Sequence, residues 1–456
     1  TYGDNPQAQK HLNTFYSDKV KILMARTFAR DLPGGGSREG TGYGMSIRSL
    51  WKIYMMWEKS TGVNITDVST HTINSAYWML HSMVPGGKFM TPLGDHARES
   101  TGAFYDYHRE LLLGLLPLHP TDAGARAARS MLVDSGYLQM RNSFNFVADF
   151  LYEEAAIAPL PMTALYPAFY DAGTGHISAR TGWDAGATYV HQNAGPFTES
   201  HAHRDQGHFV IWRHGWLLDD ANIRSSSGLS LEEFNHNVVR YVGPSGVVTQ
   251  VVSASPSEVL ALFDNAHFHY AVTDSTPVYS GKAEVIKSQR ELVFIKPGCV
   301  VVFDRAVVNA PSVARVFTMN MSTAPSIAGH TFVLNKPDAN MSVTRVAPAG
   351  LPWATVAYTP GGGYPLGGAR MEAASSVGTE TLFLHTIDVM DTVTASVADN
   401  AAGQTGCLVS FVDGSTVLVR FNHATTGGTL KLTTSTGEVL YDGLLPATVQ
   451  TPPLLA

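Results

Sequence analysis

The sequence has little cysteine, little charge and no long apolar run. Only two of its 456 residues are cysteines, Cys299 and Cys407, so a disulfide framework is excluded, although a single bridge is not. Charged residues make up 15% and the net charge is −7, without the basic cluster typical of nucleic-acid-binding proteins. No stretch approaches the ~18 apolar residues of a membrane-spanning helix. We therefore expect neither nucleic acid nor a membrane as a partner.

Hydrophobic residues make up 44% of the chain, which is enough for several packed cores. From about residue 14 to 158, apolar residues recur at three- and four-residue spacing, which predicts helices. From residue 177 onward, short β-branched runs alternate with turn residues, as in antiparallel sheets. Helices followed by strands predict an α+β protein. We expect a helical domain at 1–160, a large β domain at 161–370 and a smaller β unit at 371–456.

The densest cluster of ionisable side chains is the segment TESHAHRDQGHF, from Thr198 to Phe209. If this segment is a strand, His201, His203 and Asp205 project from the same face. Two such histidines can bind one divalent metal ion, or one can bind the metal while the other does acid–base work. Further ligands are then expected on the following strands. The candidates are Asp219, Asp220 and His236.

A second concentration of functional groups is the glycine-rich segment GGGSREGTGYG, from Gly34 to Gly44. Glycine lets a backbone approach a ligand closely, while Arg38, Glu39 and Tyr43 supply a cation, an anion and a phenol. The alternative interpretation is an ordinary loop between helices.

These segments together carry a family resemblance. SREGTGYG, PGGKFMTPLGD, HAHRDQGHF and the later NHNVV resemble the heparinase II/III-type polysaccharide lyases. The resemblance covers the helical part and most of the β part, but not the residues beyond about 370. It implies an incomplete (α/α) toroid followed by an antiparallel β-sandwich. It also implies that a uronic acid polymer, such as alginate or a glycosaminoglycan, binds between the two.

The resemblance also implies roles for individual residues. β-Elimination removes the C5 proton of a uronate, stabilises the enolate that forms and protonates the departing C4 oxygen. Tyr43 matches the family's general acid, which can also be the base where the geometry is syn. His201 would abstract the proton or stabilise the developing charge. His203, Asp220 and His236 would hold one structural zinc ion, with Asp220 preferred to Asp219.

Substrate contacts are expected from cationic and polar residues, because a protein of net charge −7 must concentrate positive potential where it binds a polyanion. The expected contact residues are Arg38, Glu39, His96, Ser200, Arg204 and Arg224. In the family, a residue upstream of the tyrosine neutralises the uronate carboxylate. We expect its counterpart before Thr1, with His11 as a substitute, and therefore an N-terminal fragment that completes the toroid.

Two other functions share these features. A uronate C5-epimerase would remove the same proton but return it to C5, and a non-catalytic polysaccharide-binding protein would bind without turnover. Because uronate polymers occur in the periplasm or outside the cell, we expect a periplasmic or secreted protein.

Overall fold

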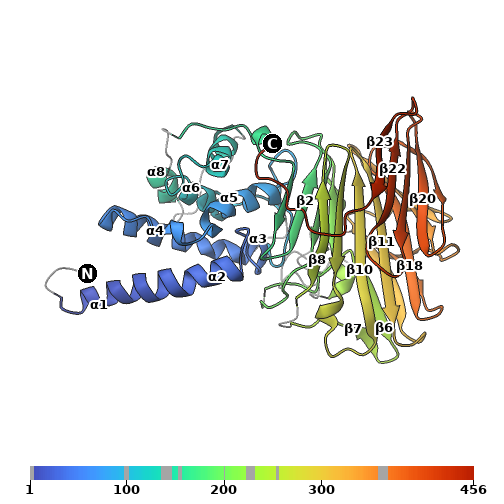
Figure 1. Cartoon of the computed structure of the whole chain (residues 1–456), viewed down its shortest axis with the longest axis horizontal. Helices are drawn as coiled ribbons and strands as arrows, with labels where there is room; N and C mark the ends of the chain where they lie inside the picture. Colours follow the sequence, from blue (N-terminus) through green and yellow to red (C-terminus); the bar gives the residue numbers. More distant parts are fainter. Residues whose placement is uncertain are drawn as a thin grey trace.

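The computed structural model describes residues 5–96, 102–134, 146–152, 157–199, 201–221, 232–252, 256–357 and 368–456. Its N-terminal part is helical, and the rest consists of stacked antiparallel sheets (Figure 1). The helical segments are α1 (Ala8–Asn13), η1 (Thr14–Met24), α2 (Ala25–Arg30), α3 (Gly40–Tyr43), η2 (Gly44–Ile47), α4 (Arg48–Thr61), η3 (Thr66–Val68), α5 (His71–Ser82), α6 (Asp106–Leu115), α7 (Ala123–Asp134), α8 (Phe146–Tyr152) and η4 (Met162–Ala164).

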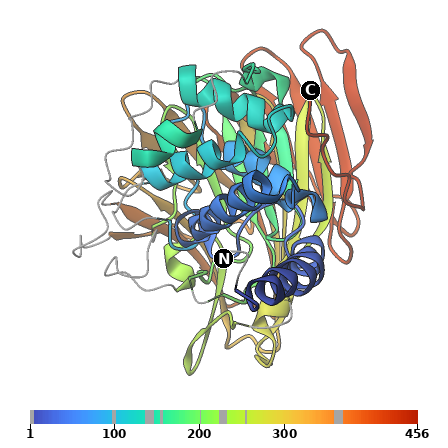
Figure 2. The ribbon, with the colours of Figure 1, turned by 90° about the vertical axis from the view of Figure 1, so that its left-hand side faces the viewer.

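The segments α1, η1 and α2 follow one another without a break and form one long helical rod. Aromatic side chains attach this rod to the other helices. Phe15 and Tyr16 pack on Trp57 of α4, with ring centroids 5.4 and 5.2 Å apart, and Phe28 stacks on His71 of α5 at 4.2 Å. Figure 2 shows the dark blue rod lying beside the group formed by α4 to α8. In that group, α6 contacts α4, α5, α7 and α8.

In the described part of the chain, all strands are paired antiparallel, in four sheets. The first sheet holds β1 (Ala168–Asp171), β2 (His176–Arg180), β3 (Tyr189–Asn193), β4 (Phe209–Trp212) and β5 (Trp216–Leu218). The eight-stranded sheet holds, in spatial order, β13 (Ser326–Ala328), β14 (Thr331–Asn335), β15 (Asn340–Ala347), β18 (Glu380–Asp388), β11 (Cys299–Val308), β10 (Val285–Ile295), β9 (Phe268–Asp274) and β8 (Glu258–Asp264).

The other two sheets have five strands each. One holds β16 (Ala354–Ala357), β17 (Ala369–Ser375), β12 (Ala314–Met321), β6 (Val239–Gly243) and β7 (Gly246–Val248). The C-terminal sheet holds β19 (Val393–Ala398), β20 (Gln404–Phe411), β21 (Thr416–Asn422), β22 (Gly428–Thr433) and β23 (Val439–Leu444). Two short 3-10 segments, η5 (Glu233–Asn235) and η6 (Thr276–Tyr279), lie in the connections.

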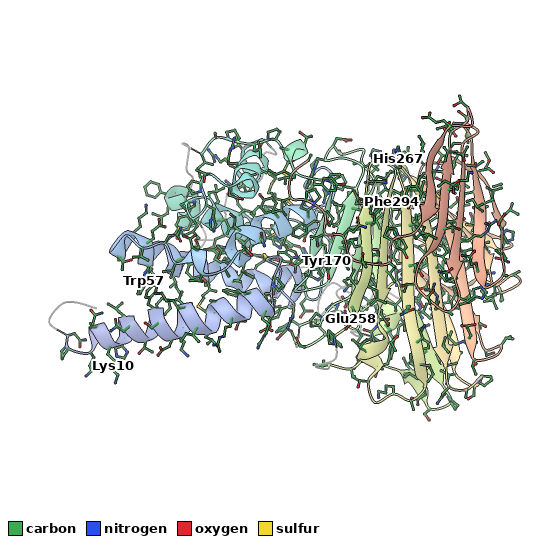
Figure 3. The ribbon with its side chains drawn as sticks, viewed as in Figure 1. Lys10, Trp57, Tyr170, Glu258, His267 and Phe294 are labelled. Atoms are coloured by element: carbon green, nitrogen blue, oxygen red, sulfur yellow. The ribbon has the colours of Figure 1, made fainter. Side chains whose placement is uncertain are left out.

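The eight-stranded sheet is buried on both faces, which explains the nearly continuous apolar run of β11. Because successive side chains of a strand point to opposite faces, Val300 and Val302 enter one core and Val301 and Phe303 enter another. The first core lies toward β12 and β17, and the second lies toward the C-terminal sheet, where Phe303 stacks on Phe421 at 4.8 Å. In Figure 3, Phe294 lies within this stack of sheets and Trp57 lies among the helices.

The structure bears out the α+β fold class, with a helical part followed by a large antiparallel β part. The boundary expected between residues 370 and 371 falls inside β17, and β18 also joins the eight-stranded sheet. The C-terminal sheet begins only at Val393. Both cysteines are buried free thiols, so the single bridge that the sequence allowed is not formed. In the described segments, no helix is long and apolar enough to cross a membrane.

Candidate active site and metal-binding cluster

Tyr43 and His201, the predicted catalytic pair, lie against each other where the helical part meets the first sheet. Tyr43 ends α3, and His201 lies in the connection from β3 to β4. Their rings stack with centroids 3.6 Å apart and planes inclined by 8°. Tyr43 is 49% exposed, and the His201 side chain is 29% exposed. Two groups capable of proton transfer therefore reach solvent side by side.

The segment that carries His201 is not a strand, contrary to the sequence-based prediction. Residues 201–208 form an irregular connection, and β4 begins only at Phe209. The backbone N–H of Asp95 donates to the carbonyl of His201 at 3.0 Å, so this connection is tied to a loop of the helical part instead of a neighbouring strand. His201 and His203 nevertheless act together, because one side chain binds both.

That side chain is Asp95, which the sequence reasoning did not select. Its Oδ2 lies 2.8 Å from Nδ1 of His201, and its Oδ1 lies 3.0 Å from Nε2 of His203. The Asp95 side chain is only 2% exposed. In the segment PLGDH, the residue expected at the site was His96, which directly follows Asp95. No local sequence pattern marks Asp95, because the two histidines that it contacts are far away along the chain.

The three predicted metal ligands come together, although they lie on three separate connections. One potential ligand atom from each of His203, Asp220 and His236 lies within 4.8 Å of the other two, and all three residues are buried. Asp220 lies shortly after β5, and His236 directly follows η5 in the connection to β6. Of Asp219 and Asp220, it is Asp220 that belongs to this cluster.

The hydrogen bonds of the cluster fit a metal ion. His203 binds Asp95 through Nε2, while its buried Nδ1 has no hydrogen-bond partner in the described part of the chain. A histidine whose second nitrogen is held by a carboxylate is the usual arrangement of a metal-binding histidine. Two imidazoles and one carboxylate suit zinc. The cluster can therefore hold a divalent cation through Nδ1 of His203 together with Asp220 and His236.

A further buried histidine, His208, lies near the carboxylate of this cluster. The backbone N–H of Asn237 donates to Nδ1 of His208 at 2.7 Å, so the proton of a neutral His208 sits on Nε2. Nε2 lies 3.8 Å from Oδ2 of Asp220. Burial keeps the pKa of His208 well below its ordinary value, so this imidazole stays neutral. It adds no positive charge beside a cation.

The glycine-rich segment positions Tyr43. A Cβ on Gly40 would lie 1.6 Å from the carbonyl oxygen of Leu93, and one on Gly42 would lie 2.1 Å from that of His96. Only glycine permits α3 to approach the 93–96 loop so closely. The backbone N–H of Tyr43 then donates to the carbonyl of Asp95 at 3.3 Å. These glycines therefore serve a contact within the protein.

Asp171, the last residue of β1, fixes the start of the glycine-rich segment. Its Oδ2 accepts the backbone N–H of Gly36 at 2.5 Å, and its Oδ1 accepts those of Gly173 and Thr174 at 2.9 and 3.1 Å. Burial raises the pKa of Asp171 to about 7, while the three N–H groups act in the opposite direction. One carboxyl group thus links the loop before Tyr43 to the first sheet.

The predicted substrate-binding residues have diverse environments. Arg38 donates from Nε to the carbonyl of Gly173 at 3.1 Å and from Nη2 to that of Asp31, so two of its three nitrogens already serve the scaffold. Arg204 forms an ion pair with Glu232. Glu39 is half-buried beside the 93–94 loop. Contact of these three residues with substrate stays a prediction.

The prediction for His96 is wrong. His96 is fully buried, and its two ring nitrogens lie 2.6 Å from Oγ1 of Thr41 and 3.1 Å from the carbonyl oxygen of Ala103. Both ring nitrogens therefore serve contacts within the protein interior. Ser200 and Arg224 lie outside the described residues. His11, the expected substitute for the neutralising residue, lies in α1 and is exposed.

Comparison with known proteins finds similarity among solved structures. No family model and no curated protein matches the chain. Among solved structures, the heparan sulfate lyase HepC from Pedobacter heparinus superposes with a TM-score of 0.65 at 12% identity, covering 89% of this chain and 61% of that one. A heparinase III structure superposes with a TM-score of 0.62 at 12% identity, covering 91% and 64%. A further heparinase III gene product gives 0.65 at 12%, covering 88% and 61%.

The chain therefore has the fold of the heparinase-type polysaccharide lyases, as the resemblance in its motifs implied. It spans less than two thirds of the length of these similar structures. At 12% identity the likeness concerns the fold alone. The chemistry has to be argued from the side chains of this chain.

Proposed function

We propose that the protein is a polysaccharide lyase that cleaves a uronic-acid-containing polymer by β-elimination. The observation that carries this proposal is the stacked pair of Tyr43 and His201. The two rings lie 3.6 Å apart, are partly exposed, and occupy the junction of the helical and β parts in a heparinase-type fold. A phenol and an imidazole side by side supply the acid and the base that the reaction needs.

The geometry suggests how the protons would move. Nδ1 of His201 is held by Asp95, which leaves Nε2 without a partner in the described residues and able to accept the C5 proton of a uronate. As the C5–H bond breaks, the electron pair moves into the carboxylate-conjugated enolate. The C4–O bond then breaks, the C4–C5 double bond forms, and the hydroxyl of Tyr43 protonates the departing oxygen. In a syn geometry, Tyr43 could perform both transfers.

The metal cluster would have a structural role in this scheme. Zinc, when bound by His203, Asp220 and His236, would cross-link the connections that follow β3, β5 and η5. His201 lies two residues before His203, so the cluster would hold its backbone in place. Every proton transfer is assigned to side chains of the protein. We propose zinc because two imidazoles and one carboxylate match its preference.

The test is an activity panel on alginate, hyaluronan, chondroitin and heparan sulfate, with the absorbance of the unsaturated uronate as the readout. We expect turnover on one of these polymers, and a 10²- to 10⁴-fold loss of kcat in Tyr43→Phe and in His201→Ala. Tyr441→Phe and His267→Ala serve as matched controls, because both residues lie in the β part away from Tyr43 (Figure 3 labels His267). Full activity of both site variants would contradict the proposal.

The same panel separates the competing functions. A C5-epimerase would leave chain length unchanged and create no double bond, so product size and absorbance would both stay constant. A binding protein would retain a polymer without changing it. We also propose that the protein is periplasmic or secreted, because uronate polymers occur there; fractionation of the source cells would test this.

A further inference from the structure

Asp95 is the one carboxylate that hydrogen-bonds both histidines of the HxH segment among the described residues. Its two oxygens are divided between them, with Oδ2 on Nδ1 of His201 at 2.8 Å and Oδ1 on Nε2 of His203 at 3.0 Å. It is nearly inaccessible to solvent, with its side chain 2% exposed. Bulk water therefore cannot readily replace it as the partner of either ring.

The backbone of Asp95 makes the arrangement rigid. Its N–H donates to the carbonyl of His201 at 3.0 Å, and its carbonyl accepts the N–H of Tyr43 at 3.3 Å. The preceding residue, Gly94, has a φ of +53°, and a Cβ there would lie 2.7 Å from the carbonyl oxygen of His201. One residue thus contacts the backbone of both members of the catalytic pair and the side chains of two histidines.

The chemistry of the carboxylate decides where the protons lie. An ionised carboxylate can only accept, so each neutral histidine must present an N–H to it. His201 then carries its proton on Nδ1 and keeps a lone pair on Nε2. His203 carries its proton on Nε2 and keeps a lone pair on Nδ1, the ring nitrogen that has no hydrogen-bond partner in the described part of the chain and is therefore available to the cluster with Asp220 and His236. The two histidines are forced into opposite tautomers.

We infer that Asp95 is a positioning residue that sets both tautomers at once, making Nε2 of His201 a proton acceptor and Nδ1 of His203 a metal ligand. This inference rests on the proposed lyase function for the role of His201, and on the cluster geometry for the role of His203. It links the reacting histidine to the metal cluster through a single side chain that touches neither substrate nor metal.

Asp95→Asn tests this inference, because asparagine keeps the shape but has only one accepting oxygen. Whichever histidine faces the amide nitrogen must offer a lone pair and move its proton to its other ring nitrogen. If that histidine is His201, Nε2 becomes protonated and can no longer accept the C5 proton. If it is His203, Nδ1 becomes protonated and can no longer bind metal. We expect kcat to fall 10²- to 10⁴-fold with KM changed only a few-fold, or the bound metal to be lost.

The direct readout is nitrogen NMR of the full chain labelled with ¹⁵N-histidine, with signals assigned through His201→Gln and His203→Gln. Wild-type protein should show protonated Nδ1 in His201 and protonated Nε2 in His203, and Asp95→Asn should invert one of them. Elemental analysis of the purified variant gives its metal content. The tautomers of the wild type test the inference even if Asp95→Asn fails to fold.

Asp264→Asn is the matched control. Asp264 is also a buried carboxylate bound to a histidine, with Oδ1 3.1 Å from Nδ1 of His269, and it lies on β8, outside the site. Its substitution should leave kcat and the tautomers of His201 and His203 unchanged. The opposite tautomer in either wild-type histidine, or unchanged tautomers and kcat within about threefold in Asp95→Asn, would overturn the inference. An inactive wild type with the expected tautomers would instead refute the lyase function alone.

Discussion

Replacing Asp171 with asparagine tests how the loop before Tyr43 is held. Oδ2 of Asp171 accepts one backbone N–H and Oδ1 accepts two, so an asparagine must turn its amide nitrogen toward at least one donor. Leaving one buried N–H without a partner costs about 1–3 kcal/mol. We expect Asp171→Asn to destabilise the protein and to lower lyase activity through the position of Tyr43.

The pH dependence of this effect has a defined sign. Burial raises the pKa of Asp171 to about 7 in the folded protein, whereas an unfolded aspartate titrates near ~3.9. At a pH between these two pKa values, Asp171 is protonated more often in the folded state than in the unfolded state. The stability contributed by Asp171 is therefore fully present below about pH 4 and is lost as the pH rises through about 7. Over roughly three pH units the change is on the order of 4 kcal/mol, at about 1.36 kcal/mol per unit.

The measurement is the free energy of unfolding from urea titrations at pH 4, 5, 6, 7 and 8, for wild type and Asp171→Asn. Groups common to both proteins cancel in the difference, which isolates Asp171. We expect the stability of the wild type relative to the variant to fall between pH 4 and pH 8. A difference that stays flat or rises with pH would show that the three N–H groups outweigh burial, and would refute the reasoning.

Three further predictions concern the cluster, the glycine-rich loop and the buried histidines. His236→Ala should remove the metal from the purified protein and lower its free energy of unfolding by about 2.7 kcal/mol if free metal exceeds its Kd 100-fold; an unchanged metal content by elemental analysis would exclude this cluster. Gly42→Ala should cost about 1–3 kcal/mol of unfolding free energy, because its Cβ would lie 2.1 Å from the carbonyl oxygen of His96; a neutral effect in urea titration would argue against the contact. Burial lowers the pKa of His176 to about 3, so its unfolded state binds more protons and stability is lost as the pH falls below about 6.5. Relative to His176→Gln, the wild type should lose roughly 2–3 kcal/mol between pH 7 and pH 4.5, and an equal loss in both proteins would contradict this assignment.

The fold class could be predicted because the two periodicities in the sequence do not overlap. The recurrence of apolar residues every three or four positions ends before the strands begin, so helices and sheets form separate parts. The last domain boundary was harder to place. β17 and β18 lie beyond the glycine-rich stretch near residue 365, and nothing in their local pattern says which sheet they join. Sheet partners are set by long-range packing, as in the contact of Phe303 with Phe421.

The sequence predicted most of the residues of the site but only part of their arrangement in space. His201 and His203 were expected to share a face of a strand, but they lie in an irregular connection and are brought together by Asp95. His96 was expected in the cleft and is buried. The side-chain direction of a loop residue depends on the elements that surround it, which neighbouring letters do not specify.

The sequence by itself determined the order of helices and strands and the chemical groups at the site, because these follow from local periodicity and residue chemistry. The choice of His203, Asp220 and His236 as a set came from the family resemblance of the motifs. The tertiary structure alone decided that Asp95 binds both histidines, that Tyr43 stacks on His201 and that Asp171 holds the loop before Tyr43. The physical reason is distance along the chain. Asp95 and His201 are separated by 106 positions, and only the docking of the helical part on the first sheet brings their atoms to 2.8 Å.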